Sequence, residues 1–92
     1  MIVRIMGEGQ LELPEDQFDH LNSLDADVES AVSSGDESRF RAALTALLDA
    51  VRAAGSPVAD DALVDSDLIM PPADASLGEV RAMLTDEGLI PG

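Results

Sequence analysis

The chain has 92 residues, with 19 acidic side chains against five basic ones, and its formal net charge is −14 at pH 7. A chain of this length forms one small domain, so we assign residues 1–92 to a single acidic unit. Such a charge disfavours binding to nucleic acids and direct docking on an anionic membrane, and the absence of Cys excludes disulfides and thiolate chemistry.

The acidity has two explanations, and both remain open at this point. It provides a solvated surface that keeps the protein dissolved, including in a high-salt cytoplasm, or it complements a basic partner. Met1 begins a short apolar run with no basic segment before it, and no apolar stretch approaches the roughly 20 residues that span a bilayer. We therefore expect a cytoplasmic protein without direct membrane insertion.

Residues 1–13 form the one clear β region. "MIVRIM" is rich in β-branched and apolar residues, "GEG" interrupts it, and "QLELP" alternates polar residues with Leu. This pattern predicts a hairpin whose loop lies at Gly7–Gly9. The first strand is apolar on both faces apart from Arg4, which predicts that both faces are covered. Because a lone hairpin is marginal in water, we expect a third short strand at Leu68–Met70.

A first helix is predicted from Pro14 or Glu15 to a stop at Gly35, because acidic residues suit its first turn and Gly suits its end. Its apolar residues follow helical spacing and form one stripe. The stripe consists of Phe18, Leu21, Leu24, Val28, Ala31 and Val32.

A second helix is predicted to begin with either an Asp36 cap or a capping box of Ser34 and Glu37, and to end at Gly55. Glu37 and Arg41 have the i,i+4 spacing of an ion pair. The short loop between the two helices predicts an antiparallel helical hairpin. The main stripe of the second helix consists of Phe40, Ala43, Leu44, Leu47, Val51 and Ala54.

The second helix is unusual because Ala46, Ala50 and Ala53 lie to one side of its main stripe. The apolar arc then covers more than half of the circumference at 100° per residue. A helix of this kind is either central in its own domain or shared with a partner. Residues 56–75 read as an irregular connection, apart from the expected short strand.

A third helix is predicted to begin at a capping box of Ser76 and Glu79 and to end at Gly88. The tail after it contains Leu89 and Ile90, which either fold back onto the core or wait for a partner's groove. The fold expected from all of these elements is α+β. A small N-terminal β-hairpin packs on an antiparallel two-helix hairpin, with a short third helix.

No group of residues indicates catalysis, a metal or a cofactor. His20 is the single histidine and is interpreted as a surface residue, since a transition metal needs clustered ligands. The acid pairs Asp25/Asp27, Asp60/Asp61 and Asp65/Asp67 do not fit a calcium-loop pattern and read as solvated loop acids. Nothing matches a nucleophile elbow or a dinucleotide-binding loop. We therefore expect a protein that is not an enzyme.

Three segments in order carry a family resemblance: "MIVRIMGEGQ", "GDESRFRAALTALLDAVRAAG" and "LIMPPADASLGEVRAMLTDEGLIPG". Together they resemble the small phage-shock-protein-A-associated family over almost the whole chain. Gly78 departs from the expected pattern, since a helix-forming residue suits its position better. The resemblance implies a companion of phage shock protein A, a helical membrane-remodelling protein that acts in envelope stress. It implies no functional residues that carry over to this chain.

The expected function is therefore that of an adaptor or regulator that binds a helical partner and is membrane-peripheral through it. The predicted contact residues are Ala46, Ala50 and Ala53, together with Leu89 and Ile90. Small side chains permit the close approach of a partner helix. The alternatives are a self-associating dimer that uses the same flank, and a small-molecule sensor with a pocket between hairpin and helices.

Overall fold

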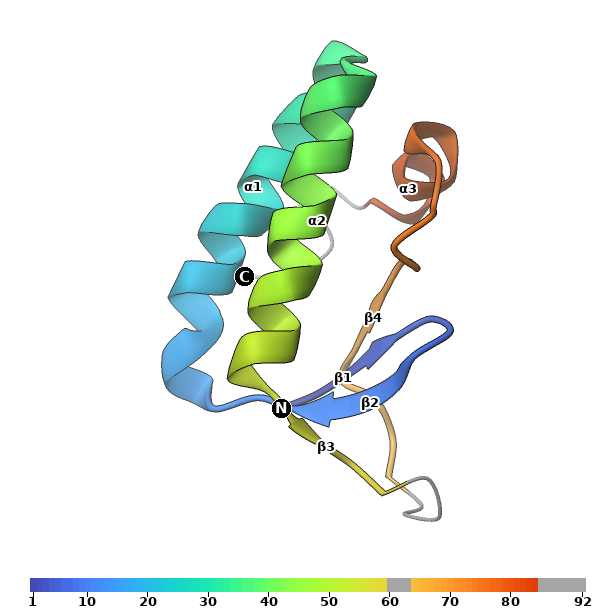
Figure 1. Ribbon diagram of the computed structural model, residues 1–92. Coiled ribbons are helices and arrows are strands. Elements are labelled where there is room, and N and C mark those ends of the chain that lie inside the picture. Colours follow the sequence, from blue (N-terminus) through green and yellow to red (C-terminus); the bar gives the residue numbers. More distant parts are fainter. Residues whose placement is uncertain (60–63, 85–92) are drawn as a thin grey trace.

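A computed structural model describes residues 1–59 and 64–84 of the chain (Figure 1). Its architecture is α+β, as the sequence predicts. A four-stranded mixed sheet lies at one end of an antiparallel helical hairpin, and a short third helix lies beside the hairpin.

Strands β1 (Ile2–Ile5) and β2 (Gly9–Glu12) form the expected antiparallel hairpin. The turn between them needs backbone conformations that side chains disfavour, because Gly7 and Gly9 have φ angles of 87° and 114°. The glycines of "GEG" therefore fix the place where the chain reverses.

Strand β4 (Leu68–Met70) confirms the predicted third strand and runs parallel to β1. A further strand of two residues, β3 (Ser56–Pro57), pairs with β2 and was not predicted. The order in the sheet is β3-β2-β1-β4. Pro57 stands on an edge strand, where its missing N–H group costs no ladder hydrogen bond to a further strand.

Helices α1 (Phe18–Ser34) and α2 (Glu37–Ala54) form the predicted hairpin. A 3-10 turn at Glu15–Gln17 precedes α1. Gly35 ends α1 in the left-handed conformation with φ 72°, and the Asp36 side chain accepts from the Arg39 N–H to cap α2. Of the two predicted caps for α2, the Asp36 cap is the one observed.

The core lies between the helical hairpin and one face of the sheet. The inward residues of the strands meet the predicted helical stripes, and Leu48 joins them although it lies outside the predicted main stripe. The fully buried large side chains include Val3, Ile5, Val28, Phe40, Leu44, Leu47, Leu48, Val51, Met70 and Val80.

Two burial predictions were wrong. The first strand is fully covered on one face only: Val3 and Ile5 are buried there, whereas on the other face Ile2 is half-buried and Arg4 is exposed. Asp25 is not a solvated loop acid: it lies within α1, is 2% exposed and takes part in an interaction. Its spacing from Leu21 and Val28 places it on the buried side of the helix.

Helix α3 (Leu77–Met83) begins with the predicted capping box of Ser76 and Glu79. The prediction that it continues to Gly88 was wrong, because Leu84 already has an extended backbone with ψ 139°. Leu84 is half-buried and packs against the core, so the helix ends where the chain turns this side chain inward.

Candidate partner-binding site

The predicted alanine flank lies on the outer side of α2. Ala46 and Ala53 are exposed and Ala50 is half-buried, whereas Leu47 and Val51 on the inner side are fully buried. The broad apolar arc of α2 therefore divides into a core side and an accessible side. We call Ala46, Ala50 and Ala53 the alanine flank.

A shallow hollow of about 300 Å³ adjoins the alanine flank. It forms because the end of the antiparallel α2 returns to the start of α1. One side comes from the segment that enters α1, and the other from the last turns of α2. Its lining residues are Pro14, Gln17, His20, Ala50, Ala53 and Ala54.

Sequence reasoning assigned only two of these six residues, Ala50 and Ala53, to the contact region. Gln17 and His20 are three residues apart, which places them on one side of a helical turn, and the short loop to α2 makes the two helices antiparallel. Together these signals bring Gln17, His20 and Pro14 next to the end of α2. His20 is a surface residue, as expected, and it lies at the edge of the predicted contact region. Leu89 and Ile90, the other two predicted contact residues, lie outside the described residues.

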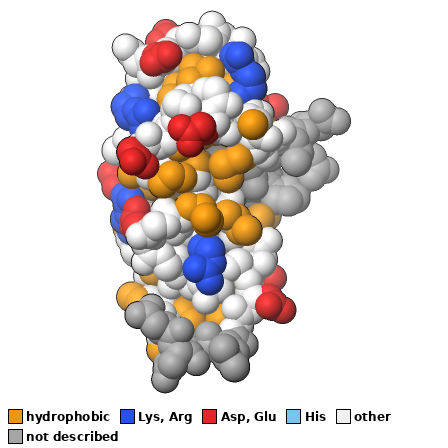
Figure 2. Space-filling model, turned by 90° about the vertical axis from the view of Figure 1, so that its right-hand side faces the viewer, with side chains coloured by type: hydrophobic (Ala, Val, Ile, Leu, Met, Phe, Trp, Pro, Cys, Tyr) orange, Lys and Arg blue, Asp and Glu red, His pale blue; other side chains and the backbone are white. Residues whose placement is uncertain are grey.

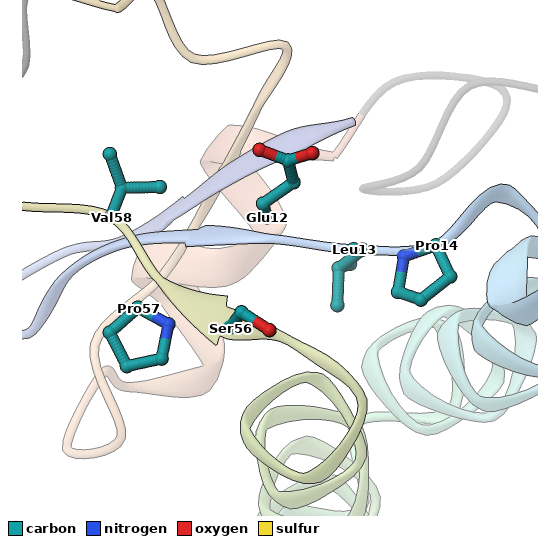
Figure 3. A pocket seen from close by; sticks show the side chains of 6 residues that line it. All are labelled: Glu12, Leu13, Pro14, Ser56, Pro57 and Val58. Atoms are coloured by element: carbon teal, nitrogen blue, oxygen red, sulfur yellow. The ribbon is translucent and has the colours of Figure 1, made fainter.

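A second hollow, of about 370 Å³, lies where the end of β2 meets β3 (Figure 3). Its lining is mostly apolar, with Leu13, Val58 and two prolines, and Glu12 carries its single carboxylate. Paired titratable groups, which acid–base catalysis uses, are not brought together here. This hollow offers shape and apolar contact rather than a reactive centre.

Four of the five arginines hold elements of the fold together. Arg52 Nε donates to Glu8 Oε1 at 2.8 Å and so joins α2 to the β1–β2 turn, and Arg52 also pairs with Asp49. This hydrogen bond and the positive charge of Arg52 lower the pKa of Glu8 below its ordinary value. The carboxylate of Glu8 raises the pKa of Arg52 further above its already high value.

The other three of these arginines donate hydrogen bonds to α1 or to the segment before α3. Arg41 donates to the Ala73 and Ala75 carbonyl oxygens at 2.6 and 2.8 Å, and Arg81 donates to the Val32 carbonyl oxygen at 2.9 Å. Arg39 makes a longer bond of 3.4 Å to the Ser30 hydroxyl. Arg41 thus reaches the segment before α3. The ion pair with Glu37 that the i,i+4 spacing suggests is absent from the described structure. Because four of the five arginines are used within the fold, most of the acidic side chains that the structure describes face solvent without an ion-pair partner.

Two further features concern membranes and metals. Within residues 1–59 and 64–84, no helix is both long and apolar enough to cross a bilayer. The same residues contain no cluster of three or more His, Cys, Asp or Glu side chains arranged to hold a metal ion.

Comparison with known protein families gives one match over the whole chain. The family model described as "PspA-Associated protein" matches residues 1–92. Comparison with curated proteins and with solved structures gives no match.

Proposed function

Because the chain belongs to the PspA-associated protein family, we propose that it is a non-enzymatic adaptor or regulator that binds the helical protein PspA, phage shock protein A. In this proposal it acts in the membrane stress response. It is cytoplasmic and reaches the membrane surface only through its partner. The observation that carries the proposal is the accessibility of the alanine flank on α2.

The flank suits a helical partner for a geometric reason. Alanine side chains let a second helix approach closely, and the adjoining hollow receives a larger side chain from that helix. Gln17 and His20 at the rim provide polar groups that fix its orientation. The occupant we expect is therefore an amphipathic helix whose apolar stripe meets Ala50 and Ala53.

The charge of the chain indicates what flanks that apolar stripe. A protein with a net charge of −14 attracts basic side chains and speeds their association, most strongly at low salt. We therefore expect Lys or Arg beside the apolar positions of the partner helix.

The binding test replaces Ala50 with Arg and measures the affinity for purified PspA from the same source by titration calorimetry. Ala50→Arg should weaken binding at least tenfold, because a long charged side chain blocks the close approach of a helix. Thr45→Arg is the matched control, since Thr45 is exposed on another side of the same helix and the charge change is identical. It should change the affinity less than twofold.

The outcome is interpreted together with the thermal melt. Equal binding by both variants would contradict the proposal. A large fall in melting temperature for Ala50→Arg alone would show instead that Ala50 belongs to the protein's own core.

Self-association through the same flank is the competing function. Two copies that each carry −14 repel one another, which disfavours a dimer at low salt. Sedimentation across protein concentrations separates the two functions: we expect a monomer, whereas a dimer that Ala50→Arg dissociates would replace the adaptor proposal.

A further inference from the structure

The outer face of the sheet carries side chains that the core does not use. Along β1, Val3 and Ile5 point into the core, so Arg4 points outward. Met6 continues this alternation, since its N–H still donates to the Met70 carbonyl oxygen at 3.1 Å. The parallel register places Ile69 of β4 directly beside Arg4. We call Arg4, Met6 and Ile69 the outer sheet patch.

The apolar members of this patch are unusually accessible. Ile69 is 52% exposed and Met6 is 45% exposed, and both are among the few large hydrophobic side chains that the described residues leave exposed. Figure 2 views the side of the molecule that carries β4 and α3, and shows hydrophobic side chains gathered in a band across its middle. Met6 and Ile69 therefore leave large apolar side chains exposed on the same face of the sheet, beside Arg4, and such a grouping is a candidate contact surface for another molecule.

Arg4 differs from the other four arginines because it has no hydrogen bond or ion pair with any residue that the structure describes. Gln10 lies opposite Arg4 on β2, but its side chain is bound elsewhere: Nε2 donates to the Val64 carbonyl oxygen and to the Ser66 hydroxyl. Glu12 lies opposite Ile2 and not opposite Arg4. Arg4 is exposed, so its guanidinium can receive an anion from outside.

We infer that the outer sheet patch binds an apolar peptide segment of a partner protein, with a carboxylate of that segment meeting the Arg4 guanidinium. Arginine binds a carboxylate through two parallel N–H donors, which fixes position and orientation. Ile69 and Met6 provide the apolar contact beside it. Arg and Met are both enriched at protein interfaces, whereas the acidic residues that dominate this chain are depleted there.

Charge argues for this occupant over the others. A second copy or an anionic bilayer would bring much more negative charge to the patch than one carboxylate does, and the chain already carries −14. The patch is separate from the alanine flank on α2, so the inference stands whether or not that flank binds PspA.

The test places a photo-crosslinking aromatic residue at Met6 in the full chain, within its native cells. Mass spectrometry then identifies the cross-linked peptide. We expect a protein adduct whose cross-linked segment contains Asp or Glu, and at least a tenfold loss of this adduct in Arg4→Glu. Arg39→Glu is the matched control, because it makes the same charge change at an exposed residue away from the patch. It should change the yield less than twofold.

Capture of a protein alone does not support the inference. The deciding experiment exchanges the charges of Arg4 and of the captured carboxylate. Changing the captured carboxylate to Lys should restore cross-linking to Arg4→Glu. If Arg4→Glu lowers the melting temperature, the neutral Arg4→Gln replaces it, and the same loss of adduct is expected. No adduct, a lipid or self adduct, insensitivity to Arg4, or failure of the exchange would each overturn the inference.

Discussion

Gly55 joins the end of α2 to β3 at a point where the chain passes very close to β2. A Cβ atom built there would lie 2.9 Å from the Leu11 Cβ and 2.9 Å from the Val51 carbonyl oxygen. Its φ of −88° is open to any residue, so the contact and not the backbone conformation requires glycine. The sequence indicates a helix end at Gly55, but it does not reveal this contact with a strand over 40 residues away.

The first prediction follows from this contact. Gly55→Ala should destabilise the protein by roughly 1–3 kcal/mol, because neither the Leu11 Cβ nor a helix carbonyl can move without shifting backbone. Urea unfolding measures the change. Gly78→Ala is the control, since only Ser76 Oγ lies within reach, at 4.0 Å, and it should be neutral or up to about 1 kcal/mol more stable. Equal effects at the two glycines would contradict the packing argument.

Glu8 supplies a second prediction at this scale, because its pKa is lowered in the folded protein by the hydrogen bond from Arg52. The stabilisation is therefore present above the unfolded pKa of about 4.3 and is lost as the pH falls through the folded value. Both side chains are more than a third exposed, so the pair contributes at most about 1 kcal/mol.

The measurement compares wild type with Glu8→Gln by chemical unfolding across pH. The stability difference should be largest above the unfolded pKa of about 4.3 and should be lost as the pH falls through the lower folded pKa, where Glu8 takes up its proton. Arg52 stays charged throughout, so a difference that persists at low pH would show that packing, not charge, joins these residues.

At the scale of elements, α3 is small and depends on arginines for its position. Val80 is its one buried residue, while Arg41 binds the Ala73 and Ala75 carbonyl oxygens before it and Arg81 binds the Val32 carbonyl oxygen at the end of α1. These bonds join α3 to both helices of the hairpin. Replacing a single one of these arginines can therefore weaken the attachment of α3 to the helical hairpin.

Arg41→Ala should loosen α3 without unfolding the hairpin. Loss of two hydrogen bonds from an exposed cation costs about 1 kcal/mol, which corresponds to about fivefold faster amide hydrogen exchange at Val80 and Leu84. Exchange within α1 and α2 should be unchanged. Arg39→Ala, which removes one 3.4 Å bond, is the control. Uniform acceleration across all helices would contradict this account.

Elements with local signals are the ones that the sequence predicts well. The Asp36 cap, the Ser76 capping box and the Gly35 stop involve neighbouring residues, so their signals are complete within a few positions. Strand β3 has only two residues and exists because β2 lies beside it, which no local pattern reveals.

The candidate site likewise has a part that the sequence predicts from local spacing and a part that depends on contacts between distant segments. Helical spacing identifies Ala46, Ala50 and Ala53 as a separate flank, and their accessibility agrees with that spacing. The hollow and the outer sheet patch depend on pairing between distant segments, so they appear only in three dimensions. Asp25 was missed although its signal was present: its apolar i−4 and i+3 neighbours, Leu21 and Val28, are both buried.

At the scale of the whole molecule, charge is the dominant property. The described structure contains two ion pairs, both made by Arg52, so most of the acidic side chains that it describes have no ion-pair partner and repel one another. This repulsion opposes the folded state and is screened over about 3 Å in molar salt. The melting temperature should therefore rise from low salt to molar KCl. A flat response would show that the acids are too far apart to affect stability.

The central claim is that the accessible side of α2 receives a partner helix. The most direct measurement is a methyl NMR titration of the alanine-labelled protein with PspA, which needs no substitution at the site. The account predicts large shifts of the Ala46, Ala50 and Ala53 methyl signals, while Ala26, exposed on the outer side of α1, stays unchanged. Binding that leaves the three flank signals in place would contradict it.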